Sequence, residues 1–287
     1  MQAISEDTAR AAETILKSIT IPAQPQIVLD LMKLSGQANN VDIRQIAAKV
    51  QKDPSLAAKI LKIVNSPVFG LRRPVDSIAQ ALSLMGFQLF QRAVLASALR
   101  DAVGAGGDAG AQAFWVHSEI TARCREIVAR KLRSDLTSQA YLAGLFHDCA
   151  IPIMRKKFPD YDKLIARYLH YSSIVVKDED EAYKTNHCVM GYFFTRSWHL
   201  PEPVRLAILR HHDDEPQYED SGEARALTAI LKVSEYIVQD YDTSGSIKTL
   251  LPEKWIEVNS DSVDILGIMP QDVQEFEDQL LEAINRH

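Results

Sequence analysis

The sequence predicts an all-α protein built as a two-lobed helical bundle, with an N-terminal helical lobe packed on a second helical lobe. Its 287 residues are 46% hydrophobic and 24% charged, which is the composition of a globular protein. Apolar residues recur at the three- and four-residue spacing of amphipathic helices along most of the chain. A Gly/Ala-rich joint at 104–112, which holds four of the twelve glycines, separates the two lobes.

Start and stop signals divide the first lobe into four helices. Asp42 and Asp53 are candidate N-caps, and Pro54 stands at a first helical position. A third helix begins near Asp76 or Ser77 and meets Gly86, after which a fourth continues. Their apolar faces comprise Ile43, Ile46, Ala47 and Val50, then Ala57, Ile60, Leu61 and Val64, then Ile78, Ala81, Leu82 and Met85, and finally Phe90, Ala93 and Val94.

The second lobe is predicted to be helical as well. An amphipathic stripe precedes AYLAGLFHD (140–148), a compact helix rich in small residues. The run at 171–176 is short and apolar, so it fits either a strand or a helix. Pro270 opens a last helix. The stripe before AYLAGLFHD consists of Val116, Ile120, Cys124, Ile127 and Val128. The apolar face of the last helix consists of Val273, Phe276, Leu280 and Ile284.

Charge and segment composition exclude several classes of function. The net charge is −6, and no Lys/Arg run forms the basic stripe that duplex nucleic acid requires. The sequence shows neither the roughly eighteen uninterrupted apolar residues of a membrane span nor the basic-then-apolar order of a secretory signal. We therefore expect a cytoplasmic protein that binds neither nucleic acid nor membrane. The three cysteines include no CxxC pair and are interpreted as small buried hydrophobes.

Five histidines and two acids form the pattern with the clearest chemical meaning. Successive members are separated by about one helix and a return, which lets the helices of a bundle direct them into one pocket. Imidazole with carboxylate suits iron, manganese or zinc, as one ion or as two ions bridged by a carboxylate. The alternative is that these are ordinary surface or core histidines. The candidate ligands are His117, His147, Asp148, His187, His211, His212 and Glu235.

Other polar residues receive a structural interpretation. His170, His199 and His287 are interpreted as structural or exposed. Arg210 and Lys232 lie near candidate ligands and could neutralise a phosphate, but solvated helix residues are the preferred interpretation. Trp115 and Trp198 are expected in the core.

The segments IPAQPQIVLDLMKL, IAAKVQKDPSLAAKILKIVNSPVFG and VDSIAQALSLMG resemble the first half of an HDOD domain, a signalling relative of the HD phosphohydrolases. FWVHSEITA, AYLAGLFHD, HCVMGYFFTRSWHLPEPVRLAILRHHD and ILKVSE resemble its second half. The resemblance covers about 15–285. It implies an N-terminal lobe at 15–103, an HD-like lobe at 113–245 and a C-terminal segment with a helix at 246–287.

The resemblance also implies roles for the candidate ligands, with departures. His117, the doublet His147-Asp148, His187 and His211-His212 resemble the ligand set of the HD and HD-GYP hydrolases, whereas Glu235 replaces a closing aspartate. Cys149-Ala150-Ile151 replaces the Ile-Gly-Lys that follows the doublet in HD-GYP hydrolases, and no Gly-Tyr-Pro element follows His212. Cyclic-dinucleotide hydrolysis of that type is therefore not supported.

The predicted function is a regulatory module of signal transduction that binds signalling proteins and carries a metal site without efficient catalysis. One alternative is a metal-dependent phosphohydrolase acting on a nucleotide or phosphodiester, with Asp148 as the bridging ligand. Another is a sensor that binds a nucleotide in the pocket without cleaving it. Phe69, Arg72 and Arg73 are the candidate partner-binding residues, although Phe69 could instead fold back onto the seam between the lobes.

Overall fold

The computed structural model describes residues 4–18, 26–34, 43–65, 73–103, 109–165, 173–213, 220–242 and 252–285. In these ranges every regular element is a helix, so the all-α prediction is confirmed. The chain divides into two compact units. Helices α2 to α5 belong to one unit, and α1 with α6 to α16 (up to Leu281) belongs to the other.

The smaller unit is organised around its longest helix. Helices α2, α3 and α4 each contact α5, which bends at Gly86, where a φ of +75° interrupts the helical backbone. The two helices predicted on either side of Gly86 are therefore confirmed. Gln91 Nε2 of α5 donates a hydrogen bond of 2.9 Å to the Leu31 carbonyl of α2. The helices are α2 (Gln26–Leu34), α3 (Ile43–Gln51), α4 (Pro54–Val64) and α5 (Ile78–Val103).

Helix α4 begins as the sequence predicts. The Asp53 side chain accepts a hydrogen bond of 3.0 Å from the Leu56 backbone N–H, and Pro54 is the first helical residue. Ile60 and Val64 are buried as expected, whereas Asp42 lies outside the described residues. By length and composition α5 could cross a membrane, but 72% of its apolar window is buried inside the structure, the pattern of a core helix.

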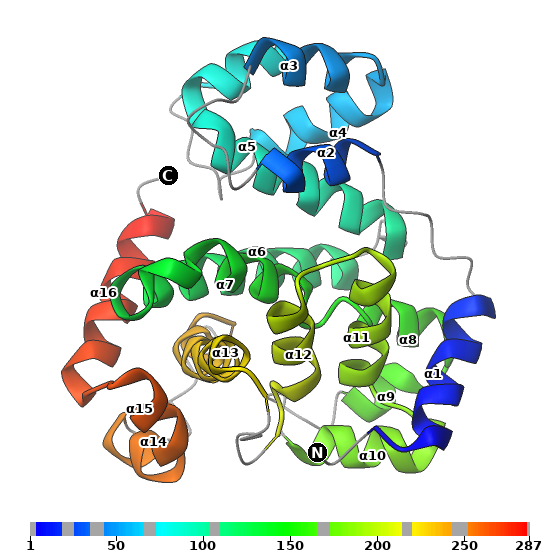
Figure 1. Ribbon diagram of the computed structural model, residues 1–287, viewed down its shortest axis with the longest axis vertical. Helices are drawn as coiled ribbons and strands as arrows, with labels where there is room; N and C mark the ends of the chain where they lie inside the picture. The colour runs from blue at the N-terminus through cyan, green and yellow to red at the C-terminus, as the bar shows by residue number, and fades with distance from the viewer. Residues whose placement is uncertain are drawn as a thin grey trace. The chain divides into compact units, whose positions relative to one another are not determined.

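The larger unit holds all the candidate ligands. Helices α6 and α7 lie side by side, and α13 contacts α6, α7, α12 and α15, so it is the central helix (Figure 1). Helix α11 packs against α12 and α1. The elements are α1 (Glu6–Ser18), α6 (Ala109–Leu132), η3 (Ser134–Leu136), α7 (Thr137–Phe146), α8 (Ile151–Lys157), α9 (Tyr161–Ile165), α10 (Ser173–Tyr183), α11 (His187–Ser197), α12 (Glu202–Arg210), α13 (Gly222–Asp242), α14 (Pro252–Val258), α15 (Ser260–Leu266) and α16 (Pro270–Asn285).

Several sequence expectations for this unit can be compared with the structure. The described part of 171–176 is the start of helix α10, so the strand alternative is wrong there. Trp115 and Trp198 are buried, as are Ile120, Cys124 and Val128 of the predicted α6 stripe, but Val116 is 38% exposed. Helix α16 opens on Pro270 and buries Val273, Phe276 and Leu280.

Helices α6 and α7 approach closely at Gly144. A Cβ atom added to Gly144 would lie 2.5 Å from Ala122 Cα and 2.9 Å from Arg125 Cδ, both on α6. A side chain at position 144 would therefore collide with backbone, which a change of rotamer cannot relieve. The absence of a side chain lets the end of α7 lie directly beside α6.

Candidate metal centre

Two helix ends fix two of the candidate ligands in the same way. His147 follows the end of α7, and its Nδ1 donates a hydrogen bond of 2.7 Å to the Gly144 carbonyl three residues earlier. His211 follows the end of α12, and its Nδ1 donates a hydrogen bond of 2.7 Å to the Ile208 carbonyl. The last carbonyls of a helix lack helical partners, so they are available to these rings. Because a carbonyl only accepts, each Nδ1 carries a hydrogen, and Nε2 is the nitrogen that has a lone pair whenever the ring is neutral.

His187 is fixed by a carboxylate instead. Asn186 caps α11 by accepting a hydrogen bond of 2.9 Å from the Val189 backbone N–H, which makes His187 the first helical residue. The His187 Nδ1 atom lies 2.7 Å from Glu179 Oε2, which also accepts the His187 backbone N–H at 3.1 Å. The Tyr161 hydroxyl donates to the other Glu179 oxygen, and Glu179 is fully buried. These bonds leave His187 Nε2 as the ring nitrogen that is available to a ligand.

The three Nε2 atoms surround the Asp148 carboxylate. His147 Nε2 lies 2.9 Å from Asp148 Oδ2, and the Nε2 atoms of His211 and His187 lie 3.4 and 3.8 Å from Oδ1. Asp148 is 1% exposed, and neither of its oxygens has a properly oriented hydrogen-bond donor in the described part of the chain. Asp148 is therefore the point at which the histidines converge.

The remaining candidate ligands lie in the same cluster. The His117 ring centroid is 6.1 Å from that of His147, and the His212 centroid is 5.1 Å from that of His187. Glu235 Oε1 on α13 is 3.9 Å from His147 Nε2. The structure thus brings together all seven residues that the sequence analysis selected. Their donor atoms include two groups that could hold a metal ion, His117 with His147 and Asp148, and His187 with Cys188, His211 and His212.

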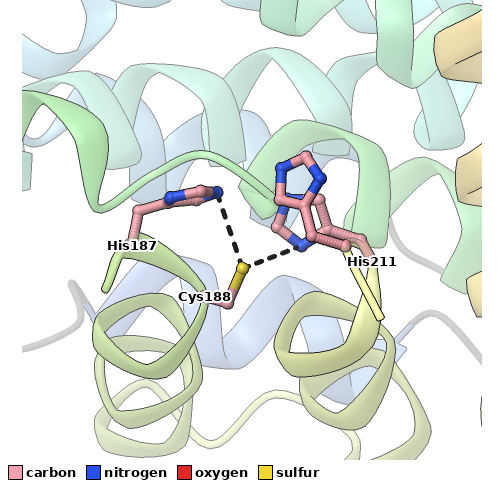
Figure 2. A group of neighbouring side chains, drawn as sticks. His187, Cys188 and His211 are labelled. Atoms are coloured by element: carbon pink, nitrogen blue, oxygen red, sulfur yellow. Dashed lines mark hydrogen bonds between the residues drawn. The ribbon is translucent and has the colours of Figure 1, made fainter. Parts of the chain in front are cut away.

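Cys188 is a member that the sequence analysis missed. All three cysteines are buried, as expected, but Cys188 Sγ lies 3.5 Å from His187 Nε2 and 3.7 Å from His211 Nδ1, between the two rings (Figure 2). Its position directly after His187 in the sequence was the available signal. Cys188 is therefore a candidate sulfur ligand and not only a buried hydrophobe.

The ionisation states follow from burial and nearby charge. Burial and the Arg125 guanidinium lower the pKa of His147 to about 3, so its imidazole is neutral at pH 7. Burial raises the pKa of Asp148, but the contacts with His147 and His211 outweigh it and hold that pKa well below its usual range. Burial lowers the pKa of His211, yet the charge of Cys188 and the contact with Asp148 raise it to about 10. The negative charges of Cys188 and Asp148 thus favour a positive charge at His211, and a metal ion bound there would displace the His211 proton.

The residues present fit a metal ion. Nitrogen and oxygen ligands at about 2.0 to 2.2 Å from a common ion are about 2.9 Å apart at right angles and about 3.4 Å apart in a tetrahedron. The contacts of Asp148 with His147 and His211, at 2.9 and 3.4 Å, have these lengths. The neutral His147 Nε2 and the ionised Asp148 Oδ2 are two acceptors that face each other, and a cation between them would relieve that repulsion.

Arg125 is a further residue that the sequence analysis did not select. Its side chain is fully buried on α6, and its Nη2 donates a hydrogen bond of 3.0 Å to Glu235 Oε1. Burial lowers the pKa of Arg125 to about 10, so it remains protonated at pH 7. It follows His117 by eight residues, about two helical turns, which places both on one face of α6.

Residues with other expected roles can also be placed. Arg210 is 8% exposed and pairs with Asp213 at 3.3 Å and Asp220 at 3.6 Å, so the preferred interpretation of a solvated residue is wrong for it. Lys232 Nζ donates to the Asp213 carbonyl. His199 is exposed, whereas His170 and His287 lie outside the described residues, as do Phe69 and Arg72 of the predicted partner surface. Arg73 is exposed.

Glu179 provides a test of how His187 is oriented. Replacing Glu179 with glutamine removes the charge that accepts the His187 Nδ1–H, and we expect metal affinity to fall by about 10- to 100-fold. Competition against a coloured chelator measures this affinity. Glu181→Gln, at an exposed position of the same helix, is the matched control. Equal affinities of the two variants would contradict this role of Glu179.

The chain belongs to the HDOD domain family, whose model matches residues 21–214. The family that the resemblance predicts is therefore confirmed. An HDOD domain protein of Geobacter sulfurreducens has 23% identity and a TM-score of 0.73, with 98% of this chain and 97% of that chain covered. A "Putative signal transduction protein" of Marinobacter aquaeolei has 21% identity and a TM-score of 0.73, with 99% and 66% covered. A "Putative phosphohydrolase" of Shewanella amazonensis has 20% identity and a TM-score of 0.65, with 95% and 97% covered.

At these identities the solved structures show a shared fold. Among curated proteins, an "Uncharacterized protein" of Treponema pallidum is 24% identical over 224 residues, which are 73% of this chain and 41% of that protein. The protein YuxH of Bacillus subtilis is 29% identical over 116 residues, 40% of this chain and 28% of that protein. The chain thus spans less than half the length of these curated relatives.

Proposed function

We propose that this chain is a signal-transduction module that acts by binding signalling proteins, and that its HD-type pocket holds a metal ion without being an efficient phosphoesterase. Membership of the HDOD family and the similarity to a protein named for signal transduction support the regulatory role. The observation that carries the metal proposal is the contact of the neutral His147 Nε2 with the ionised Asp148 Oδ2 at 2.9 Å.

The surroundings of the doublet support weak catalysis. A phosphoester substrate needs cationic or donor side chains as well as a metal ion. Cys149, Ala150 and Ile151, which follow the doublet, are at most 1% exposed and carry no cationic group. Arg210 pairs with the carboxylates of Asp213 and Asp220, and Lys232 donates to the Asp213 backbone carbonyl. This part of the pocket therefore offers little to hold a phosphate.

A metal-dependent phosphohydrolase is the second candidate, and the position of Asp148 favours it. The two Asp148 oxygens contact different histidines, Oδ2 that of His147 and Oδ1 those of His187 and His211, which is the arrangement of a bridging carboxylate. A bound ion would supply an acidified water as nucleophile. In that case Asp148 and the histidines orient the ion, and His117 and Glu235 complete the pocket.

Metal analysis combined with a phosphoester panel separates the candidates. Protein purified without added metal is analysed for iron, manganese and zinc, and is then incubated with nucleotides and model phosphodiesters. Stoichiometric metal without turnover is expected for the regulatory module. Turnover that is lost in His147→Ala would instead establish the phosphohydrolase. If the metal content were zero after reconstitution with each ion, the metal proposal would be wrong.

Cys188 is expected to bind the ion through sulfur. Zinc–sulfur and zinc–nitrogen bonds of about 2.3 and 2.0 to 2.1 Å place the two ligand atoms about 3.6 Å apart in a tetrahedron, and Cys188 Sγ is 3.5 Å from His187 Nε2. A thiolate ligand favours zinc over manganese. Cobalt-substituted protein should show a sulfur-to-cobalt charge-transfer band that Cys188→Ser removes and Cys149→Ser retains. A wild-type spectrum without that band would show that Cys188 is not a ligand.

A further inference from the structure

The candidate donors of the pocket form two groups that differ in chemistry. Among the residues that the structure describes, the donor atoms of each group lie within 4.8 Å of one another. One group, called the sulfur group below, combines a thiol with imidazoles, and the other, the carboxylate group, combines a carboxylate with imidazoles. The sulfur group is His187, Cys188, His211 and His212, and the carboxylate group is His117, His147 and Asp148.

We propose that the pocket holds two unlike ions, a zinc ion in the sulfur group and a harder divalent ion, manganese or iron(II), in the carboxylate group, with Asp148 joining them. This proposal rests on the proposed metal site and adds the number and the identity of its ions. It also makes Cys188, which the sequence analysis did not select, the residue that distinguishes the two positions.

The donors of the pocket are too many for one ion. Four residues of the sulfur group, three of the carboxylate group and Glu235 make eight candidate donors. Zinc usually takes about four ligands, and an octahedral ion such as manganese takes about six. Eight donors therefore exceed the ligand set of one such ion but suit two ions.

Asp148 is placed to join the two ions. Its Oδ2 lies 2.9 Å from His147 Nε2 in the carboxylate group, and its Oδ1 lies 3.8 Å from His187 Nε2 in the sulfur group. In two-metal sites the ions lie about 3.5 to 4 Å apart, a span that one carboxylate bridges by giving an oxygen to each. The negative charge of Asp148 would then offset the repulsion between the ions.

The ligands of the two positions favour different ions. Thiolates select zinc, and Cys188 Sγ lies 3.5 Å from His187 Nε2, a separation that tetrahedral zinc provides. Carboxylates suit manganese, and Glu235 adds a second carboxylate to the carboxylate group. Glu235 Oε1 lies 3.9 Å from His147 Nε2, within the about 4.0 to 4.4 Å that separates opposite ligands of one ion. The hydrogen bond of 3.0 Å from Arg125 orients this carboxylate.

Burial adds a second difference between the two positions. His187, Cys188 and His211 are at most 3% exposed, whereas His117 is half-buried and the Glu235 side chain is 19% exposed. Structural zinc sites are closed by protein ligands, whereas a catalytic ion keeps an open position for water. We therefore expect the zinc ion to exchange slowly with a chelator and the ion of the carboxylate group to exchange rapidly.

Loading with a limiting amount of zinc tests the proposal. Metal-free protein receives about one equivalent of Zn²⁺ and then an excess of Mn²⁺, because an excess of zinc would fill both positions. After equilibrium dialysis we expect about one zinc and about one manganese per chain. X-ray absorption should then show one sulfur at about 2.3 Å from zinc, and only nitrogen and oxygen around manganese. This measurement locates both ions in the wild-type protein.

Two substitutions should separate the two ions. Cys188→Ser should lower the affinity for zinc by at least the roughly 10-fold that loss of an outer partner already costs, with a much smaller effect on manganese. His117→Gln should lower the affinity for manganese in the same way and spare zinc. Cys149→Ser, at another buried cysteine, is the matched control for Cys188→Ser and should bind both ions as the wild type does.

Manganese in contact with sulfur, zinc without a sulfur neighbour, or a single ion in wild-type protein would overturn the proposal while leaving the metal site intact. Equal losses of both ions in Cys188→Ser and His117→Gln would also overturn it. A wild-type chain that binds no ion would overturn the proposed metal site and this proposal together.

Discussion

Replacing Asp148 with alanine should abolish metal binding. Asp148 contacts the Nε2 atoms of His147, His211 and His187, so its removal leaves any ion without its central carboxylate. Loss of a partner that merely orients a ligand already costs about 10- to 100-fold in affinity, and loss of the ligand itself should cost more. Elemental analysis after loading and dialysis measures the effect. Asp162→Ala, at a side chain that is 72% exposed, is the control and should retain its metal.

The same variant should lose the stability that metal binding supplies. A ligand at about 100 times its dissociation constant stabilises the folded protein by about 2.7 kcal/mol. A chelator should therefore lower the melting temperature of wild-type protein and of Asp162→Ala, but not that of Asp148→Ala. A melting temperature of Asp148→Ala that falls with chelator as much as that of wild type would contradict the assignment of Asp148.

Alanine in place of Gly144 should destabilise the larger unit. Alanine normally stabilises a helix relative to glycine by about 0.5 to 1 kcal/mol, but here the new Cβ would lie 2.5 Å from Ala122 Cα. Separating α6 from α7 to relieve that contact should cost about 1 to 3 kcal/mol, a large share of the roughly 5 to 15 kcal/mol that stabilises a typical protein. The midpoint of urea unfolding should fall accordingly.

Gly222→Ala is the matched control for this change. Gly222 begins α13, and a Cβ atom added there meets nothing within 4 Å. This variant should be neutral or gain stability by up to about 1 kcal/mol, because alanine restricts the unfolded chain. Similar unfolding midpoints for the two variants would show that α6 and α7 do not depend on a glycine at their contact.

Local signals explain how much of the fold the sequence could predict. Asp53-Pro54 marks the start of α4, and Gly86 marks the bend of α5, because capping and positive φ depend on one or two residues. The strand alternative for 171–176 failed at its described positions because a short apolar run has no distinctive period. How the two lobes pack stays a prediction.

The sequence predicted the candidate ligands of the site, but not the residues that pair with them. The order of the seven ligands along the chain suffices to propose that they meet, since helices of a bundle return to one pocket. The roles of Glu179 and Arg125 depend on pairings with His187 and Glu235, and Arg125 is 110 residues from its partner. Spacing within one helix offered a signal for Arg125, which lies two turns after His117, but nothing in the sequence identifies Glu235 as its partner.

The bonds from His147 and His211 to carbonyls three residues earlier join each ring to the final turn of its helix. Fraying of the last turn of α7 or α12 would therefore release the ring, and an ion that holds the ring would in turn suppress fraying. Ion occupancy and the order of these two helix termini are thus thermodynamically linked. The pocket can in this way transmit its loading state to the backbone of both helices without any rearrangement of the fold.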